Sequence, residues 1–277
     1  MAITSVDKLV DALLNNSSRL IIDKASVTSQ AAGNYVSLWR ATGQPGQGAI
    51  PAAAAVCNNA LLGAINFNQQ IAPAQSALGQ LEVSCGNAMT TVEIHDRLAH
   101  MGGLNGTLAT AQTVGIDFSA LTSDNLASRI GDANYSDIQW WLEWYTATGA
   151  TAVTCTVNVT YNDGTTGALS VALAATRPAS LMIPLNGLIP AGGAGKYIRG
   201  ITSIQNSATT ATAGSFGVTA TRFRGSVTAF AAFVKYREDW AGIGLSEVAN
   251  SACLFPLVQT TTTSSGIVRG TGKVAHG

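Results

Sequence analysis

The stretch VTCTVNVTYNDGTTGALSVAL at residues 153–173 decides the fold class. Apolar residues alternate with threonine and asparagine as far as Tyr161, and apolar side chains return at Leu169, Val171 and Leu173 after an Asn-Asp-Gly segment. A period of two is that of a strand with one buried face, and Asn-Asp-Gly is typical of tight turns. The stretch therefore predicts an antiparallel β-hairpin.

Comparable apolar runs lie on both sides of this hairpin. They are separated by Gly-rich or Ser/Thr-rich turns, and no helical pattern lies between them. Short strands at this spacing are typical of a sandwich or jelly roll. The sequence thus predicts a mainly β fold, with an antiparallel β-sandwich or jelly-roll-like body. The further strands are expected at 81–83, 92–95, 138–145, 180–185, 197–205, 215–223 and 227–236.

The N-terminal segment has the pattern of a helix over about residues 5–14. Thr4 or Ser5 is a suitable N-cap, and an apolar stripe follows at helical spacing. A helix of this length is marginal alone, so it is expected to pack on its own body or on a neighbouring subunit. The apolar stripe consists of Val6, Leu9, Val10, Leu13 and Leu14.

Composition changes on either side of the predicted strands. Residues 25–80 are rich in Ala, Gly, Gln, Asn and Pro, with GQPGQG at 43–48, which predicts an extended arm with at most short elements. The Thr-, Ser- and Gly-rich composition of residues 260–277 predicts a flexible tail unless something holds it. We therefore divide the chain into an N-terminal helix and extended arm, 1–75, and a β-sandwich body with an extended C-terminal tail, 76–277.

The chain is poor in charge for its size. Charged residues make up 11% of the 277 residues, where about 25% is usual. The hydrophobic fraction of 47% excludes an intrinsically disordered chain. A surface with so few ionic groups is poorly hydrated, so we expect much of it to be covered by other copies of the chain or by a partner.

The net charge is zero, with 15 basic and 15 acidic residues. This balance argues against specific nucleic-acid binding or membrane binding as the main task. Residues 61–145 nevertheless hold eight acidic and two basic residues, and residues 177–277 hold nine basic and three acidic ones. The halves are expected to neutralise each other within a subunit or head-to-tail between subunits, or to be scattered solvated charges.

The ends and the cysteines bear on location and redox chemistry. The N-terminus lacks a basic segment followed by a long apolar run, and the apolar stretch 49–65 is interrupted by Pro51 and two asparagines. We therefore expect synthesis in a cytoplasm, without a membrane span. The cysteines at 57, 85, 155 and 253 show no C-x-x-C spacing, so buried free thiols are expected.

Two strings resemble a phosphate-binding loop. GGAGK at 192–196 and GTGK at 270–273 both lack the first glycine and the Ser or Thr after lysine, and both are expected to be ordinary loops. The sequence contains neither G-x-S-x-G nor H-E-x-x-H. It therefore predicts a protein without enzymatic activity and without a cofactor.

The densest polar cluster contains Glu93, His95 and His100. Carboxylate and imidazole groups on one strand and the following loop are potential metal ligands. The same residues, with Asp96 and Arg97, also suit an exposed strand end carrying an ion pair. We favour the strand end, and no metal site is predicted.

The run WWLEWY at 140–145 places Trp140 and Trp144 on one face of a strand and Trp141 and Tyr145 on the other. One pair is expected in the core. The other is expected at a subunit contact, or alternatively as a stacking platform for sugars or bases.

Five stretches with structural motifs cover most of residues 37–222. They are SLWRATGQPG (37–46), HDRLAHMGGLNGTLATAQTV (95–114), WWLEWYTATGATAVTCTVNVTYNDGTTG (140–167), LMIPL (181–185) and TAGSFGVTATR (212–222). Together they resemble a family of tailed-bacteriophage virion proteins. The resemblance implies a β-rich component of the virus particle and brings no catalytic residues.

We therefore expect a capsid decoration or cement subunit, located in the virion and assembled in the host cytoplasm. Its expected partners are further copies of itself, as in a trimer, and other virion proteins such as the major capsid protein. The alternatives are a receptor- or glycan-binding fibre or tail protein, a major capsid or tail-tube subunit, and a metal-dependent enzyme at the Glu93 cluster. The expected interface residues are Val6, Leu9, Val10, Leu13, Trp39, Trp141 and Tyr145.

Overall fold

The computed structural model describes residues 3–70, 76–211 and 214–277. Packing divides the chain into two compact units. Unit 1 contains residues 1–49, 58–96 and 223–277, and unit 2 contains residues 50–57 and 97–222. Strands β6 and β13 each begin in one unit and end in the other.

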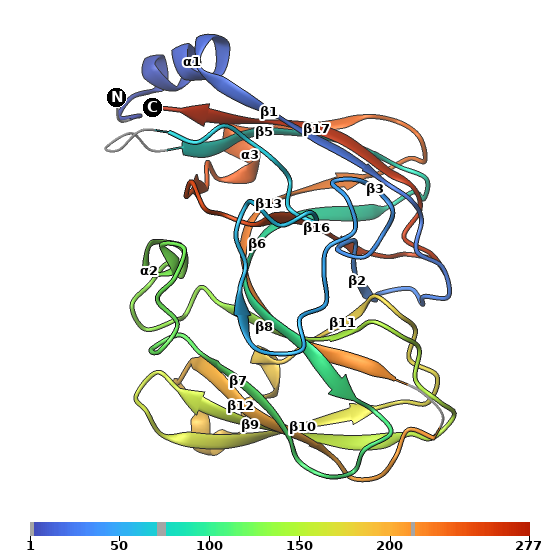
Figure 1. Ribbon diagram of the computed structural model, residues 1–277. Coiled ribbons are helices and arrows are strands. Elements are labelled where there is room, and N and C mark those ends of the chain that lie inside the picture. The colour runs from blue at the N-terminus through green and yellow to red at the C-terminus, as the bar shows by residue number, and fades with distance from the viewer. Residues whose placement is uncertain (1–2, 71–75, 212–213) are drawn as a thin grey trace. The chain divides into compact units, whose positions relative to one another are not determined.

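Unit 1 is built on an antiparallel sheet in the order β14-β5-β17-β1-β3 (Figure 1). Strand β1 alternates strictly between buried and exposed side chains, with Leu20 and Ile22 facing the core. It pairs with β17 along its whole length, with Leu20 opposite Gly272. The strands are β1 (Ser17–Lys24), β3 (Gly43–Gln44), β5 (Ser76–Cys85), β14 (Tyr236–Asp239) and β17 (Val268–His276), and β15 (Glu247–Val248) also pairs with β5.

A second layer of unit 1 consists of β2 (Tyr35–Ser37), β16 (Leu254–Gln259) and the first part of β6 (Thr90–Asn105). The core between the layers draws on both. Leu81 comes from the first sheet, and Val92 and Val258 come from the second.

Helix α1 (Val6–Asn15) packs on the first sheet of unit 1. The Ser5 side chain accepts a hydrogen bond from the Lys8 amide, which makes Ser5 the N-cap. Leu9 and Ala12 are buried against Ala275 near the end of β17. The predicted helix is confirmed, and it packs on its own chain. A short helix, α3 (Trp240–Ile243), follows β14.

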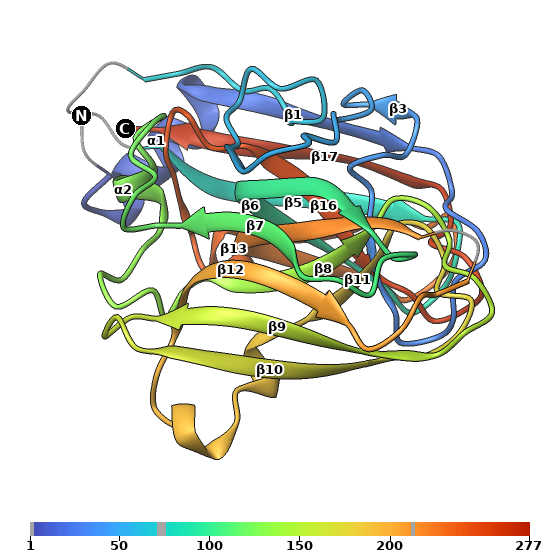
Figure 2. The ribbon, with the colours of Figure 1, turned by 60° about the horizontal axis from the view of Figure 1, so that its bottom comes forward.

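Unit 2 is also a sandwich of two antiparallel layers. One has the order β10-β9-β12-β7 (Figure 2). The other contains β11, β8 and the first part of β13, and β4 pairs with the second part of β6. Both layers supply the core, for example Trp140 and Val157. The strands are β4 (Ala55–Val56), β7 (Gln112–Asp117), β8 (Gln139–Trp144), β9 (Val153–Tyr161), β10 (Thr166–Leu173), β11 (Leu181–Pro184), β12 (Ile198–Asn206) and β13 (Ser215–Ala229); short helices are α2 (Leu126–Arg129), η1 (Asn186–Leu188) and η2 (Ala191–Gly193).

The predicted hairpin is β9 and β10. Leu169, Val171 and Leu173 lie opposite Val157, Cys155 and Val153, and all six side chains are buried. Gly164 has a φ of +83°, a conformation that favours glycine at this turn. The prediction of a mainly β fold with antiparallel sheets and an N-terminal helix is confirmed.

Other elements differ from the sequence prediction. The expected strands 215–223 and 227–236 are one strand, β13, followed by a loop and β14. Residues 17–24 form β1, which was not predicted. The flexible tail expected at 260–277 ends in β17, paired with β5 and β1, so the GTGK string at 270–273 is a strand and not a loop. Local composition misses β17 because its partners are distant in sequence.

The expected division at residue 75 lies at the end of segment 71–75, outside the described residues. It stays a prediction about independent folding. Residues on its N-terminal side contribute to both units: Leu20 and Val36 to the core of unit 1, and Ala54 and Val56 to contacts with the core of unit 2.

Candidate interaction surfaces

Helix α1 carries four of the seven residues expected at an interface. Leu9 faces its own chain and Leu13 is partly buried against the same cluster. Val6 and Val10 point outward, with 57% and 44% of their surface exposed, and Leu14 is 72% exposed. The helix therefore has one apolar flank packed in the chain and a second, Val6-Val10-Leu14, open to a partner.

The expected interface tryptophans are buried. Trp39 is fully covered, and its indole N–H donates to the Ala49 carbonyl over 2.8 Å. Trp141 is 3% exposed, and its indole N–H donates to Thr221 Oγ1 over 2.9 Å. Neither ring presents a face to a partner or to a sugar, so the idea of a sugar platform at Trp141 and Tyr145 is not supported by the geometry. Tyr145 is partly buried.

Both faces of β8 are covered, which explains the difference. Trp140 and Trp144 pack in the core, and Trp144 stacks on Phe216 with ring centroids 5.4 Å apart. The opposite face carries Trp141 and Glu143, which are 3% and 1% exposed, and Arg97 from β6 contacts Glu143 there. Period two identifies two faces of a strand, but it does not tell whether the second face is covered.

A buried polar network lies beside Trp141 in unit 2. Arg97 Nη2 donates to Glu143 Oε2 over 2.5 Å and to Thr219 Oγ1 over 3.0 Å, and the Thr219 hydroxyl donates to the same carboxylate. Arg97 Nε donates to His100 Nδ1 over 3.0 Å. Burial around the Tyr145 hydroxyl, with the nearby Glu143 charge, raises the pKa of Tyr145. These buried hydrogen bonds and the ion pair link side chains within unit 2 and stabilise its interior.

The candidate metal ligands Glu93, His95 and His100 do not share one site, because His95 and His100 contact different side chains. His95 Nε2 lies 2.8 Å from Glu93 Oε2, and the His95 ring contacts Phe223 and Phe255. His100 instead accepts the hydrogen bond from Arg97. Among the described residues, no group of three or more His, Cys, Asp or Glu side chains is placed to hold a metal ion.

The acidic and basic halves of the sequence meet within the chain. In unit 2, Arg199 pairs with Asp117 and Arg222 pairs with Asp137. Of the neutralisation schemes expected from the sequence, the structure shows pairing within the subunit. One such pair, Arg224–Asp96 in unit 1, is buried. The buried pair Arg97–Glu143 in unit 2 lies within the acidic half itself. These pairs reduce the charge available to hydrate the surface.

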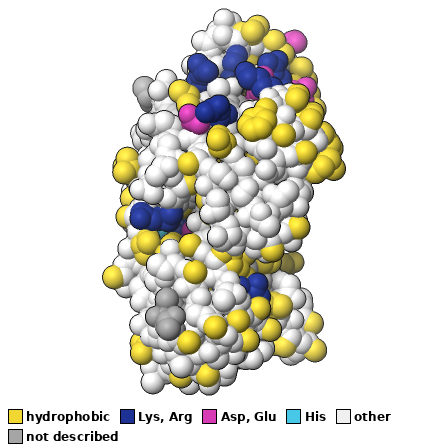
Figure 3. Space-filling model, turned by 90° about the vertical axis from the view of Figure 1, so that its right-hand side faces the viewer, with side chains coloured by type: hydrophobic (Ala, Val, Ile, Leu, Met, Phe, Trp, Pro, Cys, Tyr) yellow, Lys and Arg dark blue, Asp and Glu magenta, His cyan; other side chains and the backbone are white. Residues whose placement is uncertain are grey.

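One end of unit 1 carries an apolar patch, which we call the 230–234 patch. It comprises Phe230, Phe233 and Val234 in the β13–β14 loop, together with Ile267 just before β17. Phe233 N–H donates to the Cys85 carbonyl and the Gly86 N–H donates to the Ile267 carbonyl, so both segments flank the end of β5. Figure 3 faces this end and shows hydrophobic side chains beside basic ones in its upper part.

The conformation of Phe233 is unusual for its residue type. Its φ is +59° and its side chain is 73% exposed. The left-handed region is costly for a bulky residue, and such strain is concentrated at functional sites. The fold therefore holds an aromatic side chain in solvent at a conformational cost.

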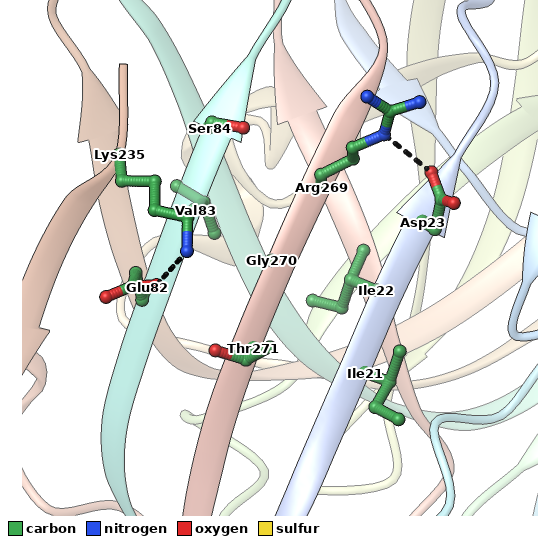
Figure 4. Close-up of a pocket in the computed structure, with 10 residues that line it drawn as sticks. All are labelled: Ile21, Ile22, Asp23, Glu82, Val83, Ser84, Lys235, Arg269, Gly270 and Thr271. Carbon is green, nitrogen blue, oxygen red and sulfur yellow. Dashed lines mark hydrogen bonds and ion pairs between the residues drawn. The ribbon is translucent and has the colours of Figure 1, made fainter. Parts of the chain in front are cut away.

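A shallow groove of about 290 Å³ adjoins the patch on the outer face of β5, β17 and β1. Figure 4 shows Lys235 paired with Glu82 on one side and Arg269 paired with Asp23 on the other. Gly270 and Thr271 of β17 line the groove between the two pairs. Hydrogen bonds from Arg237 and Lys235 lower the pKa of Glu82, so this carboxylate stays charged and the rim is ionic.

The four cysteines are free and buried, as expected from their spacing. Burial raises the pKa of the Cys155 thiol to about 12, which makes it a poor nucleophile. None of the helices in the described part of the chain is long and apolar enough to cross a membrane.

Comparison with known proteins gives no family. No protein-family model matches the chain, and no curated protein does. Among solved structures, the VP2 subviral particle of infectious bursal disease virus shares 13% identity, with 94% of this chain and 79% of that chain covered and a TM-score of 0.18. The Gt strain of that virus gives 13% identity, 96% and 86% coverage, and a TM-score of 0.19. TM-scores this low do not indicate a shared fold, and nothing about function follows from them.

Proposed function

We propose that this chain is a non-enzymatic structural subunit of a tailed-bacteriophage virion, in the role of a capsid decoration or cement protein. The observation that carries the proposal is its surface. Only 11% of residues are charged, many of these charges are paired within the chain, and large apolar side chains stand in solvent on α1 and at the 230–234 patch. Exposed apolar patches mark protein contacts. The sequence resemblance over residues 37–222 directs this reasoning to virus particles.

The mechanism is burial of apolar surface between subunits. At roughly 25 cal/mol per Å², a few hundred Å² at each contact contributes several kcal/mol, and symmetry repeats the contact over the shell. Such contacts oppose outward movement of capsid subunits under internal pressure. The proposed partners are other copies of the chain and the major capsid protein, in a virion assembled in the host cytoplasm.

The test is addition of purified protein to heads that lack it. Cosedimentation at a saturable ratio, together with DNA release at a higher temperature, is the expected result. Protein that stays in the supernatant at every concentration contradicts the decoration role. If heads cannot be isolated without the protein, the same surfaces serve a major capsid or tail-tube subunit, the variant that sequence leaves open.

A further inference from the structure

Helix α1 has more apolar surface than its own chain covers. Leu9, Ala12 and Leu13 contact unit 1, whereas Val6, Val10 and Leu14 form an exposed stripe at i, i+4 and i+8. Asp7 and Asp11 are exposed and follow this stripe around the helix. The outer flank of α1 is thus apolar with an acidic border, a pattern found in helices that pack against a partner.

The 230–234 patch is also apolar, but its border is basic where that of α1 is acidic. Its apolar side chains are followed directly along the chain by Lys235 and, two residues further, by Arg237, which are 75% and 63% exposed. Arg269 stands beside it, two residues after Ile267, and is 65% exposed. These three cations share two carboxylates, Glu82 and Asp23, so the border of the patch keeps an excess of positive charge.

Helix α1 cannot contact the 230–234 patch of its own chain. Helix α1 is fixed against Ala275 at the end of β17, whereas Ile267 precedes the start of the same strand. Eight residues of extended strand separate these points by about 26 Å. Figure 1 shows α1 and the loops at the other end of unit 1 on opposite sides. Any contact between the two surfaces therefore joins two copies.

We propose that helix α1 of one copy packs its Val6-Val10-Leu14 stripe onto the 230–234 patch of the next copy, with Asp7 and Asp11 beside Lys235 and Arg237. Because the two surfaces differ, the contact is head-to-tail. Repetition generates a closed ring when the rotation closes and a filament when it does not. The inference rests on charge complementarity and on the strained, exposed Phe233, and it deepens the proposed function by naming the contact between copies.

The contact is small. With ~150–250 Å² for a fully exposed large side chain, the exposed fractions of the seven apolar residues give on the order of 700 Å². Interfaces below about 1,200 Å² are weak. We therefore expect association at high protein concentration and dissociation on dilution, with added salt weakening the contact.

The first test is sedimentation of the full chain over a range of concentrations. The variants Val10→Asp and Phe233→Asp are each expected to weaken association at least tenfold. The control is Leu108→Asp in unit 2, because Leu108 is 44% exposed, the same fraction as Val10. Circular dichroism confirms that each variant is folded. A chain that remains monomeric at all concentrations, or a control that weakens association equally, overturns the proposal.

The second test identifies the surfaces by disulfide formation. Single-cysteine additions Val10→Cys and Phe233→Cys are oxidised separately and as a mixture, and the native cysteines are buried. Head-to-tail packing predicts a crosslinked dimer only in the mixture. Efficient dimers of Val10→Cys alone indicate a symmetric contact and refute the head-to-tail arrangement. If the protein binds heads but α1 does not contact the 230–234 patch, the inference is refuted and the proposed function is kept. If copies associate through this contact but do not bind heads, the inference is kept and the proposed function is refuted.

Discussion

The sharpest prediction from the fold concerns two truncations that differ by nine residues. Removing residues 1–15 deletes α1 but leaves β1, whereas removing residues 1–24 also deletes β1. The first loses the burial of Leu9, about 1.5–3 kcal/mol, together with the smaller contacts of Ala12 and Leu13 in the same cluster. We expect this shorter truncation to keep both units folded and to lose self-association and head binding.

The longer truncation has a much larger effect. It removes Leu20 and Ile22, which are 0% and 2% exposed, and eight register positions along β17. Truncating one such side chain to alanine costs about 2–5 kcal/mol, and a domain is stable by only about 5–15 kcal/mol. Loss of both side chains and the strand is therefore expected to unfold unit 1.

Hydrogen exchange read by mass spectrometry distinguishes the units. In the longer truncation, amides of β5 and β17 are expected to lose protection while those of β9 and β10 keep it, because the two hydrophobic clusters are separate. The shorter truncation is the control. Full protection of β5 after removal of residues 1–24 would refute the assignment of β1 to the core.

Three further outcomes follow from buried groups. Arg97→Met is expected to lower the free energy of unfolding by about 3–5 kcal/mol, because it leaves Glu143 charged and buried, and Arg97→Met with Glu143→Leu is expected to recover most of the loss; additive losses in denaturant unfolding would contradict this coupling. Burial lowers the pKa of Lys24 from 10.5 to about 8, so between these values the unfolded chain binds more protons and this lysine's contribution to stability rises with pH. The stability of the wild type relative to Lys24→Met should therefore increase from pH 8 to 10.5, by at most about 1.4 kcal/mol per pH unit, and a constant difference would exclude the shift. The thiol of Cys155, with its raised pKa, is expected to resist Ellman's reagent at pH 8 until the chain is unfolded, and rapid reaction of the native protein at Cys155 would show that its burial is transient.

Sequence reasoning predicted the elements whose signals are local. The β9–β10 hairpin was correct because alternation and turn residues both lie within 153–173. Helix α1 was correct because Ser5 and the apolar stripe are adjacent. In contrast, the composition of residues 260–277 predicts a flexible tail where the structure has β17. The partner strand β1 lies almost the full length of the chain away, and glycine and threonine carry little strand signal alone.

The candidate surface was predicted only in part. The stripe on α1 was visible from its spacing, but helical periodicity did not separate the flank that packs on Ala275 from the flank in solvent. Trp39 and Trp141 were expected at an interface, and both are buried by segments that no local pattern identifies. Phe230 and Phe233 are surface residues that no motif identifies, and the only local signal is two phenylalanines shortly before Lys235.

The proposal's central claim is that the chain is a part of a virus particle, and its most direct test is quantitative mass spectrometry of virus particles purified from cultures that express the chain. The account predicts the intact chain in the particle at a copy number comparable to that of the capsid subunits, retained through density-gradient purification. A chain that is abundant in infected cells yet absent from purified particles would contradict it.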